Sequence, residues 1–401
     1  MRLVANNRTL PYLSGRFFDG ISSGLFMMAL PWILLSTPNM GTFVALIALT
    51  CTATSFVLTP FFATLIDRHS RKLILILVQL IQSLTALVVL AAHLANWDSH
   101  WLLAGAQLVF WVSSNLAWST NNAFTQENYQ RHEYASISGK QEVVMQVTTL
   151  GAGALGVLLL QRWGMVEFSA FAAIASALAG ISYIVTPYNR QLRASLKSSF
   201  IDQMKQSRAI FALQPRFFAF LLLSCLSYPI LTFLGKLVPI WFSENGISGD
   251  WYAGYNITFG LGSLLTGLLV SKLLSLRTHQ TTMQYSMALV ALSLFGMSFA
   301  THPALILIMT LVFGFFNALN RIARTNWMHH TIDINQRGRV EGGLVLFSTS
   351  VQSVSYVLIA LLAHYDLTKF GFLIAALTML SAVLMMSLLT RTRPLLAQVS
   401  N

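Results

Sequence analysis

Long apolar runs without charged residues recur along the whole chain and constrain its fold more than any other feature. A helix needs about 20 apolar residues to cross the hydrocarbon core of a bilayer. Of the 401 residues, 55% are hydrophobic and only 9% are charged, whereas soluble domains carry about 25% charged residues. A soluble core could not cover so much apolar surface. We therefore expect an all-α polytopic membrane protein.

Twelve membrane-spanning helices are expected, and one long polar segment, 187–214, divides them into six and six. This segment is interpreted as a cytoplasmic linker between an N-terminal six-helix bundle, 1–186, and a C-terminal six-helix bundle, 215–401. No small-residue cleavage site follows the first apolar run, so it is read as a retained helix. The expected spans are 11–35, 41–65, 73–94, 101–124, 138–160, 166–186, 215–242, 250–275, 280–300, 302–323, 339–363 and 368–390.

The positions of Lys and Arg indicate the orientation, because cytoplasmic loops are enriched in both. With both termini in the cytoplasm, all of the 25 basic residues except Arg162, Lys236 and Lys369 fall in cytoplasmic loops or helix ends. The net charge of +12 then reports topology rather than nucleic-acid binding. Anionic headgroups of the cytoplasmic leaflet are the expected partner of these bases.

The two halves share a pattern at an offset of 199 residues, in which "SGKQE" corresponds to "RGRVE". The matched pairs are Asn121 and Asn320, Gly139 and Gly338, Lys140 and Arg339, and Glu142 and Glu341. Parallel repeats of six helices, with a substrate cavity between them, are typical of one large class of transporters. This pattern predicts two pseudo-symmetric bundles.

The stretch "ATLIDRHSRK", residues 63–72, joins the second and third spans and resembles the loop signature of the major facilitator superfamily. That signature reads Gly-x-Leu-Ala-Asp-Arg-x-Gly-Arg-Lys, and this chain has Ala63 and Ser70 in place of its two glycines. The positions that match are Asp67, Arg68, Arg71 and Lys72. The resemblance implies the major facilitator fold.

A finer resemblance links "GRFFDGISSGLFMMALP", residues 15–31, to bacterial drug and siderophore exporters, particularly the enterobactin-exporter-like branch. It rests on Arg16, Phe17, Gly24 and Pro31 and implies a bacterial cytoplasmic (inner) membrane. The chain departs from proton antiporters in two places. Gly153 stands where their fifth span has proline, and the fourth span lacks their membrane-embedded arginine.

Two sets of charges are gating candidates. The resemblance implies that Asp67, within the motif that also holds Arg68, Arg71 and Lys72, contacts the start of the eleventh span at Arg339. A loop that only fixes topology would explain the bases but not the acid. A mirrored contact between Lys272 and Glu142 is the second candidate, and its alternative is a Lys272 side chain that snorkels to the interface.

Ionisable residues within spans are costly and are therefore functional candidates. Asp19 lies three residues after Arg16 and either neutralises it or acts as a protonatable, substrate-binding carboxylate. Glu127 and Glu142 are the other proton-coupling candidates.

Substrate-binding candidates come from both halves. The fourth span carries amide and aromatic side chains on one face, and the tenth span carries a similar set of polar side chains. Lys236 lies near Gly235 and Pro239, which together permit unwinding of the helix. Together with Arg16, Arg321 and Arg324, Lys236 suggests an anionic substrate, and its alternative is a Lys236 side chain that snorkels to the outer headgroups. Each single aromatic more often serves packing or interface anchoring. The candidates are Arg16, Asp19, Asn115, Trp118, Asn122, Tyr228, Lys236, Tyr255, Asn317 and Arg321.

The expected function is secondary active transport by alternating access, namely proton-coupled efflux of a small amphipathic molecule such as a siderophore or a drug. Proton-coupled uptake is the alternative within transport, and a transport-dead sensor or a lipid-processing enzyme is the alternative outside it. We expect a functional monomer with no cofactor except the proton gradient, and no metal site. Cys51 and Cys225 lie in apolar spans and predict no disulfide.

Overall fold

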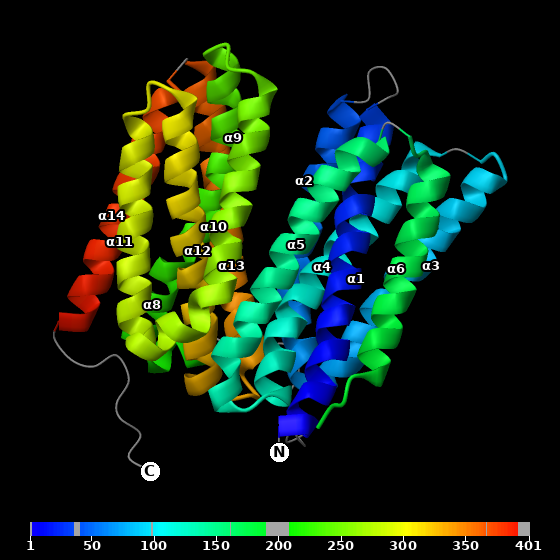
Figure 1. Ribbon diagram of the computed structural model, residues 1–401, viewed down its shortest axis with the longest axis horizontal. Helices are drawn as coiled ribbons and strands as arrows, with labels where there is room; N and C mark the ends of the chain where they lie inside the picture. Colours follow the sequence, from blue (N-terminus) through cyan, green and yellow to red (C-terminus); the bar gives the residue numbers. More distant parts are fainter. Residues whose placement is uncertain are drawn as a thin grey trace. The chain divides into compact units, whose positions relative to one another are not determined.

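The computed structural model describes residues 2–35, 41–97, 99–160, 162–189, 208–365 and 367–391, and the regular structure of these residues is entirely helical (Figure 1). Each expected span coincides with one helix, except that the seventh is divided between α8 and α9. The helices are α1 Arg2–Leu35, α2 Gly41–Arg68, α3 Arg71–Leu94, α4 His100–Asn128, η1 Arg131–Glu133, α5 Tyr134–Leu160, α6 Met165–Val185, α8 Pro215–Cys225, α9 Ser227–Glu244, α10 Gly249–Leu276, α11 His279–Ser298, α12 Pro303–Thr331, α13 Arg337–His364 and α14 Lys369–Arg391.

Among the described residues, eight segments are long and apolar enough to cross a membrane by length and composition, and one of them, Pro215–Phe242, runs across α8 and α9. The helices α1 and α4 carry more polar residues, because they direct amides and hydroxyls into the protein. Asn121 and Thr125 of α4, for example, are buried beside Tyr12 of α1. The chain is a multi-pass membrane protein.

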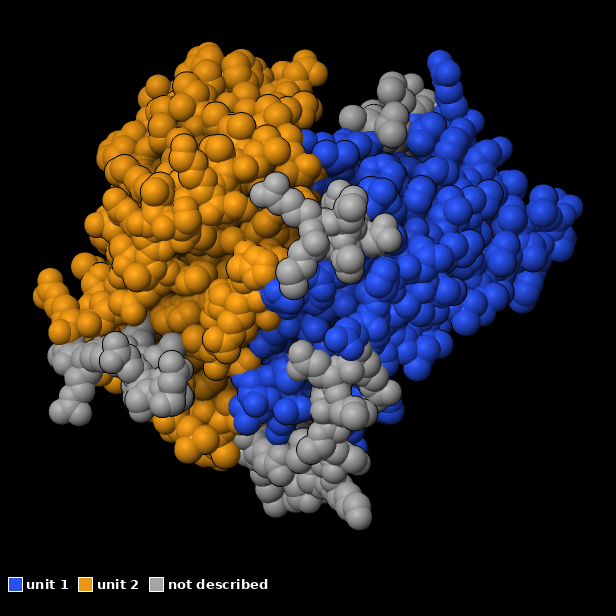
Figure 2. Space-filling model, turned by 60° about the horizontal axis from the view of Figure 1, so that its bottom comes forward, with its two compact units in different colours: residues 1–130, 144–197, 333–342 blue, residues 131–143, 198–332, 343–401 orange. Residues whose placement is uncertain are grey.

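The chain forms two compact units, which Figure 2 shows in different colours. Each unit includes a short segment from the opposite half of the sequence: 131–143, at the start of α5, belongs to unit 2, and 333–342, at the start of α13, belongs to unit 1. Unit 1 comprises Met1–Gln130, Val144–Lys197 and Asp333–Gly342, and unit 2 comprises Arg131–Val143, Ser198–Ile332 and Gly343–Asn401.

In unit 1, α1 packs against α6 and α4, α3 packs against α6 and α4, and α2 packs against α4 (Figure 1). Fully buried aromatic side chains fill the centre, where the rings of Phe26 and Phe110 lie 4.6 Å apart. Ser22 of α1 donates to the carbonyl of Ala172 and lies 2.8 Å from the hydroxyl of Ser176, both on α6. Such hydroxyls join helices within an apolar bundle.

In unit 2, α12 packs against α10 and α11, and α11 packs against α14 (Figure 1). The contact between α10 and α12 requires small residues, because a Cβ on Gly314 would stand 2.5 Å from the carbonyl oxygen of Phe259. At this close approach, Ser263 donates to the carbonyl of Gly314 at 3.1 Å and Thr266 donates to that of Phe315 at 2.6 Å. Backbone and hydroxyl contacts thus hold these two helices together.

The seventh expected span is broken at Leu226, where no break was predicted from the sequence. Pro229 has no N–H to donate to the carbonyl four residues earlier, so the helix ends and restarts ahead of it. Three side chains bind the carbonyl of Ser224 at the break: Asn320 at 3.0 Å, Arg324 at 3.0 Å and Ser227 at 3.3 Å.

The unwinding that Gly235 and Pro239 would permit near Lys236 does not occur. The helix α9 continues through Gly235 and contains Pro239 within its regular hydrogen-bonded stretch. Lys236 is exposed on this helix.

Candidate functional site

Asp67, at the end of α2, binds the start of α13 within unit 1. Its Oδ1 accepts a hydrogen bond from the amide of Gly338 at 2.7 Å, and its Oδ2 accepts from the amide of Arg339 at 3.1 Å. The Arg339 side chain adds an ion pair, with Nε 3.3 Å from Oδ2. A carboxylate is favourable here, because the first amides of a helix have no partner within the helix and carry positive partial charge. The contact expected from the motif is present.

Small residues allow α2 and α13 to approach this closely. A Cβ on Gly338 would collide with the carbonyl oxygen of Ala63, and a Cβ on Gly342 would lie 2.9 Å from the Ala63 side chain. The motif position occupied by Ala63 is therefore a contact position that needs a small side chain.

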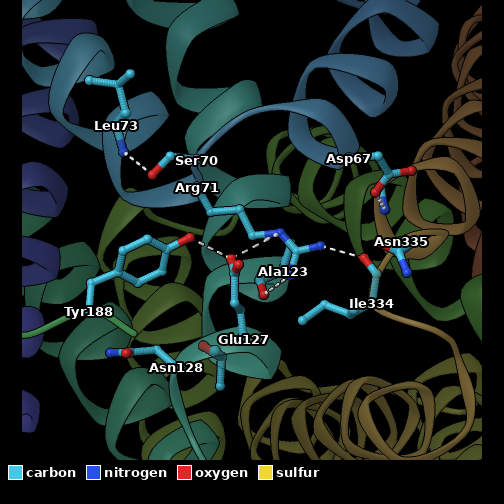
Figure 3. Close-up of polar contacts among 12 residues, drawn as sticks. Asp67, Ser70, Arg71, Leu73, Ala123, Glu127, Asn128, Tyr188, Ile334 and Asn335 are labelled. Carbon is cyan, nitrogen blue, oxygen red and sulfur yellow. Dashed lines mark hydrogen bonds and ion pairs between the residues drawn. The ribbon is translucent and has the colours of Figure 1, made fainter. Parts of the chain in front are cut away.

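Arg71, at the start of α3, is fully buried and joins three parts of unit 1 (Figure 3). Its Nη1 donates to the carbonyl of Ala123 at 2.7 Å, and its Nη2 donates to that of Ile334 at 2.6 Å. Its Nε lies 3.7 Å from Oε2 of Glu127. Burial of this guanidinium is tolerated because a carboxylate and two carbonyl oxygens surround it.

Unit 2 contains a related close approach, between α5 and α10. A Cβ on Gly139 would stand 2.5 Å from the carbonyl oxygen of Gly267. Gly139 corresponds to Gly338 in the repeat, so Gly267 takes the place of Ala63. The same helix contact is built once in each unit.

The expected contact between Lys272 and Glu142 is wrong. Asp67 lies four residues after Ala63, and the residue four positions after Gly267 is Ser271. Ser271 and the next residue, Lys272, are both exposed, so α10 places no buried side chain at the position that corresponds to Asp67. Glu142 instead pairs with Arg321 of α12.

The repeat also places Asn122 and Arg321 in equivalent positions. Asn122 of α4 donates to Oε1 of Glu341 at 3.0 Å, and Glu341 also pairs with Arg337 at 3.3 Å. Each half of the sequence thus supplies one polar side chain that holds a glutamate from the other half.

A cavity of about 230 Å3 lies within unit 1, between α1, α4 and α5. The guanidinium of Arg16 lies over the ring of Trp118, 6.0 Å from its centroid. Oδ1 of the buried Asp19 accepts a hydrogen bond from Gln79 at 2.9 Å. The lining residues are Arg16, Asp19, Gly20, Ser23, Gly24, Met27, Ser114, Ala117, Trp118, Val144, Met145, Thr148 and Thr149. The cavity thus offers a cation, a carboxylate, an aromatic face and several hydroxyls.

The sequence profile of the Major Facilitator Superfamily matches residues 12–283, more than half of the chain. The chain belongs to this superfamily. It is a transporter and not an enzyme. A comparison with curated protein sequences finds no match.

Solved structures of major facilitator transporters share the fold. A bacterial homologue of the iron transporter ferroportin, in an outward-facing state, has a TM-score of 0.78 at 14% identity, covering 95% of this chain and 99% of that chain. The human organic anion transporter MFSD10 (TETRAN) has a TM-score of 0.75 at 12% identity, covering 95% and 99%. FucP, in the outward conformation, has a TM-score of 0.73 at 12% identity, covering 96% and 99%. At these identities the likeness shows the fold alone.

The substrate-binding candidates of this major facilitator protein do not gather at one place. Arg16, Asp19 and Trp118 line the unit 1 cavity. Asn115 is exposed and donates to Ser55 at 3.3 Å. Asn122 donates to Glu341. The polar residues of α4 therefore contact different parts of the protein rather than one substrate site.

In unit 2, Arg321 is engaged by Glu142 and Asn317 is buried. Tyr255 is buried and stacks with Tyr252, their ring centroids 6.1 Å apart. Tyr228 is exposed immediately after the helix break.

The three proton-coupling candidates have different surroundings. Asp19 faces the cavity, Glu127 lies beside Arg71, and Glu142 pairs with Arg321. Among the motif bases, Arg68 is exposed, whereas Lys72 donates to the last carbonyls of α6 and of its cap, those of Ile184 and Thr186.

Three features of the site were not predicted from the sequence. The break at Leu226 had a signal in Pro229, because proline interrupts a helix. The pairing of Glu341 with Asn122 could be found from the offset of 199, once the unit 2 pair was known. Tyr188, which donates to Glu127 at 2.6 Å, lies in the polar linker and carries no motif.

Proposed function

We propose that this transporter couples proton entry to the efflux of a small amphipathic molecule, such as a siderophore or a drug, by alternating access. The cavity in unit 1 carries the proposal, because it places the buried carboxylate of Asp19 beside Arg16 and Trp118. A charged carboxylate within the membrane is costly. Protonation of Asp19 would remove this charge, so occupancy by a proton and by substrate can be linked.

The chemistry of the cavity favours a small anion with a flat apolar face. The guanidinium of Arg16 supplies the cation, and the ring of Trp118 supplies a surface on which a planar group stacks. A volume of about 230 Å3 is below the range of about 300–1,000 Å3 for sites that hold drug-sized ligands. Unit 1 alone would therefore accept a small aromatic acid, or one such group of a larger siderophore.

The Asp67 contact is proposed as the gate of the transport cycle. Asp67 and Arg339 would separate when the cytoplasmic side opens, and Arg71 and Lys72 would hold α3 to α4 and α6 during that motion. The basic loops support a cytoplasmic position for both termini, and the resemblance to bacterial exporters supports a bacterial inner membrane. Kinship with the enterobactin-exporter-like branch rests on Arg16, Phe17, Gly24 and Pro31.

The test uses purified protein in proteoliposomes under an imposed pH gradient, with salicylate as the anionic probe and ethidium as the cationic probe. Wild-type protein should move salicylate against the proton flow. Asp19→Asn should retain salicylate binding and lose about tenfold or more of the pH-driven flux, which corresponds to about 1.4 kcal/mol. Asp250→Asn removes an exposed acid in α10 and should leave the flux unchanged.

Three outcomes would contradict parts of the proposal. Full dependence of Asp19→Asn on the pH gradient would exclude Asp19 as the coupling residue. Movement of salicylate with the proton rather than against it would support uptake instead of efflux. A strong preference for ethidium would exclude the anionic substrate.

A further inference from the structure

The chain that leaves α6 is bound to the same network that holds the gate. Residues 186–189, which we call the strap, follow the end of α6 and lie in unit 1. Lys72 donates to the carbonyl of Thr186 at 2.8 Å and to that of Ile184 at 2.7 Å. The base of the strap is thereby fixed to the first turn of α3.

Asn128, the last residue of α4, binds the strap with its side chain. Its Nδ2 donates to the carbonyl of Pro187 at 3.1 Å, and its Oδ1 accepts from the amide of Asn189 at 3.4 Å. The carbonyl of Asn128 accepts from Arg8 at 2.7 Å, so α1 is joined to the same point. These bonds hold the strap backbone on either side of Tyr188.

The side chain of Tyr188 points to the buried carboxylate of Glu127 (Figure 3). Its hydroxyl donates to Oε2 of Glu127 at 2.6 Å. Its ring stacks on Phe124 with centroids 5.4 Å apart and planes 17° apart, and Phe124 stacks on Tyr12 of α1 at 5.0 Å. Both the ring and the hydroxyl of Tyr188 are therefore placed by contacts to other elements.

One oxygen of Glu127 connects the strap to the gate. The same Oε2 that accepts from Tyr188 lies 3.7 Å from Nε of Arg71. Arg71 in turn donates to the carbonyl of Ile334 at 2.6 Å, in the segment that precedes α13. A short hydrogen bond from a hydroxyl to a carboxylate is among the strong kinds, so it limits the rotation of Glu127.

We propose that Tyr188 is a positioning residue of the gate: its hydroxyl orients Glu127 so that Arg71 holds the segment before α13 beside Asp67. The proposal rests on the gating role of Asp67 given above. It makes the first residues of the linker part of the gate. Withdrawal of the Tyr188 hydroxyl from this position would release Glu127, then Arg71, and then the carbonyl of Ile334.

The test measures how accessible the segment before α13 is in membrane vesicles, without any substrate. The two native cysteines, Cys51 and Cys225, are replaced by serine, and Asn335→Cys introduces a reporter thiol next to Ile334. Tyr188→Phe removes the hydroxyl and keeps the ring. It should raise the rate at which a membrane-impermeant maleimide labels the reporter by about threefold or more, as expected from the loss of one hydrogen bond. Tyr365→Phe, which changes an exposed tyrosine of unit 2, should not alter the rate.

Combination with Glu127→Gln distinguishes positioning from general destabilisation. If Tyr188 acts through Glu127, then Tyr188→Phe adds no further increase in a Glu127→Gln protein, because coupled residues are not additive. Equal labelling rates for Tyr188→Phe and wild type would overturn the proposal. A double variant in which the effects of Tyr188→Phe and Glu127→Gln on the labelling rate are fully additive would overturn it as well. Failure of pH-driven salicylate flux in wild type would instead contradict the proposed function, because labelling needs no transport.

Discussion

Arg321 on α12 donates a hydrogen bond to the carboxylate of Glu142 on α5, inside unit 2. The equivalent residues at the offset of 199 are Asn122 and Glu341, which form the same contact at 3.0 Å inside unit 1. The repeat therefore conserves the position of the contact and changes its chemistry. A guanidinium holds the glutamate in one unit, and an amide holds it in the other.

The first prediction concerns the charge at the unit 2 contact. The Glu142 side chain is 1% exposed and that of Arg321 is 24% exposed, so Arg321→Met leaves a buried carboxylate without its guanidinium. Removal of one partner from a buried pair destabilises a protein by about 3–5 kcal/mol, and we expect about 3 kcal/mol because Arg321 is partly exposed. The melting temperature in detergent should fall clearly.

Two further variants separate charge from contact at this position. Arg321→Asn copies the amide of Asn122 and should lose less stability than Arg321→Met. Addition of Glu142→Gln to Arg321→Met should recover most of the loss, because no buried charge remains. An equal loss for the single and double variants would show that packing, not the ion pair, sets the effect.

The second prediction concerns Asp67→Asn. The amide oxygen can still accept from Gly338 or Arg339, but the negative charge at the start of α13 is lost. Hydrogen bonds to charged groups contribute about 1.5–3 kcal/mol, so the initial rate of salicylate flux should fall by about tenfold or more. Asp333→Asn, at a neighbouring exposed acid, is the control. A wild-type rate in Asp67→Asn, at equal amounts of protein in the membrane, would exclude the gate.

The third prediction tests the close approach of α5 and α10. A Cβ on Gly139 would stand 2.5 Å from the backbone oxygen of Gly267, and a backbone atom cannot rotate away. Gly139→Ala should therefore destabilise the protein by about 1–3 kcal/mol, as overpacking does. Gly235→Ala is the matched control, because beyond its chain neighbours and the adjacent backbone of its own helix no atom lies within 4 Å of the added Cβ. Equal melting temperatures for the two variants would contradict the packing of α5 on α10.

The fourth prediction concerns pH and His279, which precedes the ninth expected span. Burial, and secondarily the neighbouring His330, lower the pKa of His279 to about 4 from its usual 6.5. The unfolded chain therefore binds the extra proton between about pH 6.5 and 4 while the folded chain does not. The stability that depends on neutral His279 is present above about pH 6.5 and is lost as the pH falls towards 4.

His279→Gln should reduce the fall in melting temperature between about pH 7.5 and 5. His100→Gln, which changes an exposed histidine at the start of α4, should leave that fall unchanged. An identical pH dependence in His279→Gln and wild type would show that His279 is not a source of the acid sensitivity.

The sequence by itself determined the membrane class, the approximate positions of the spans and the superfamily. These properties depend on composition over about 20 consecutive residues and on a motif whose residues are contiguous. The contact of Asp67 with the start of α13 could also be predicted from the sequence. A carboxylate at the end of one helix needs a partner, and the motif implied which helix supplies it.

The tertiary structure decided which side chains meet across helices. The sequence suggested Lys272 as the partner of Glu142, but Lys272 is exposed on α10 and Glu142 pairs with Arg321 of α12. The close approach of Gly139 to the carbonyl of Gly267 sets how α5 and α10 pack, and only the tertiary structure shows it. Tyr188 is placed by Phe124, Asn128 and Glu127, which are distant from it in the sequence. Such contacts depend on packing between elements, and local composition carries no trace of them.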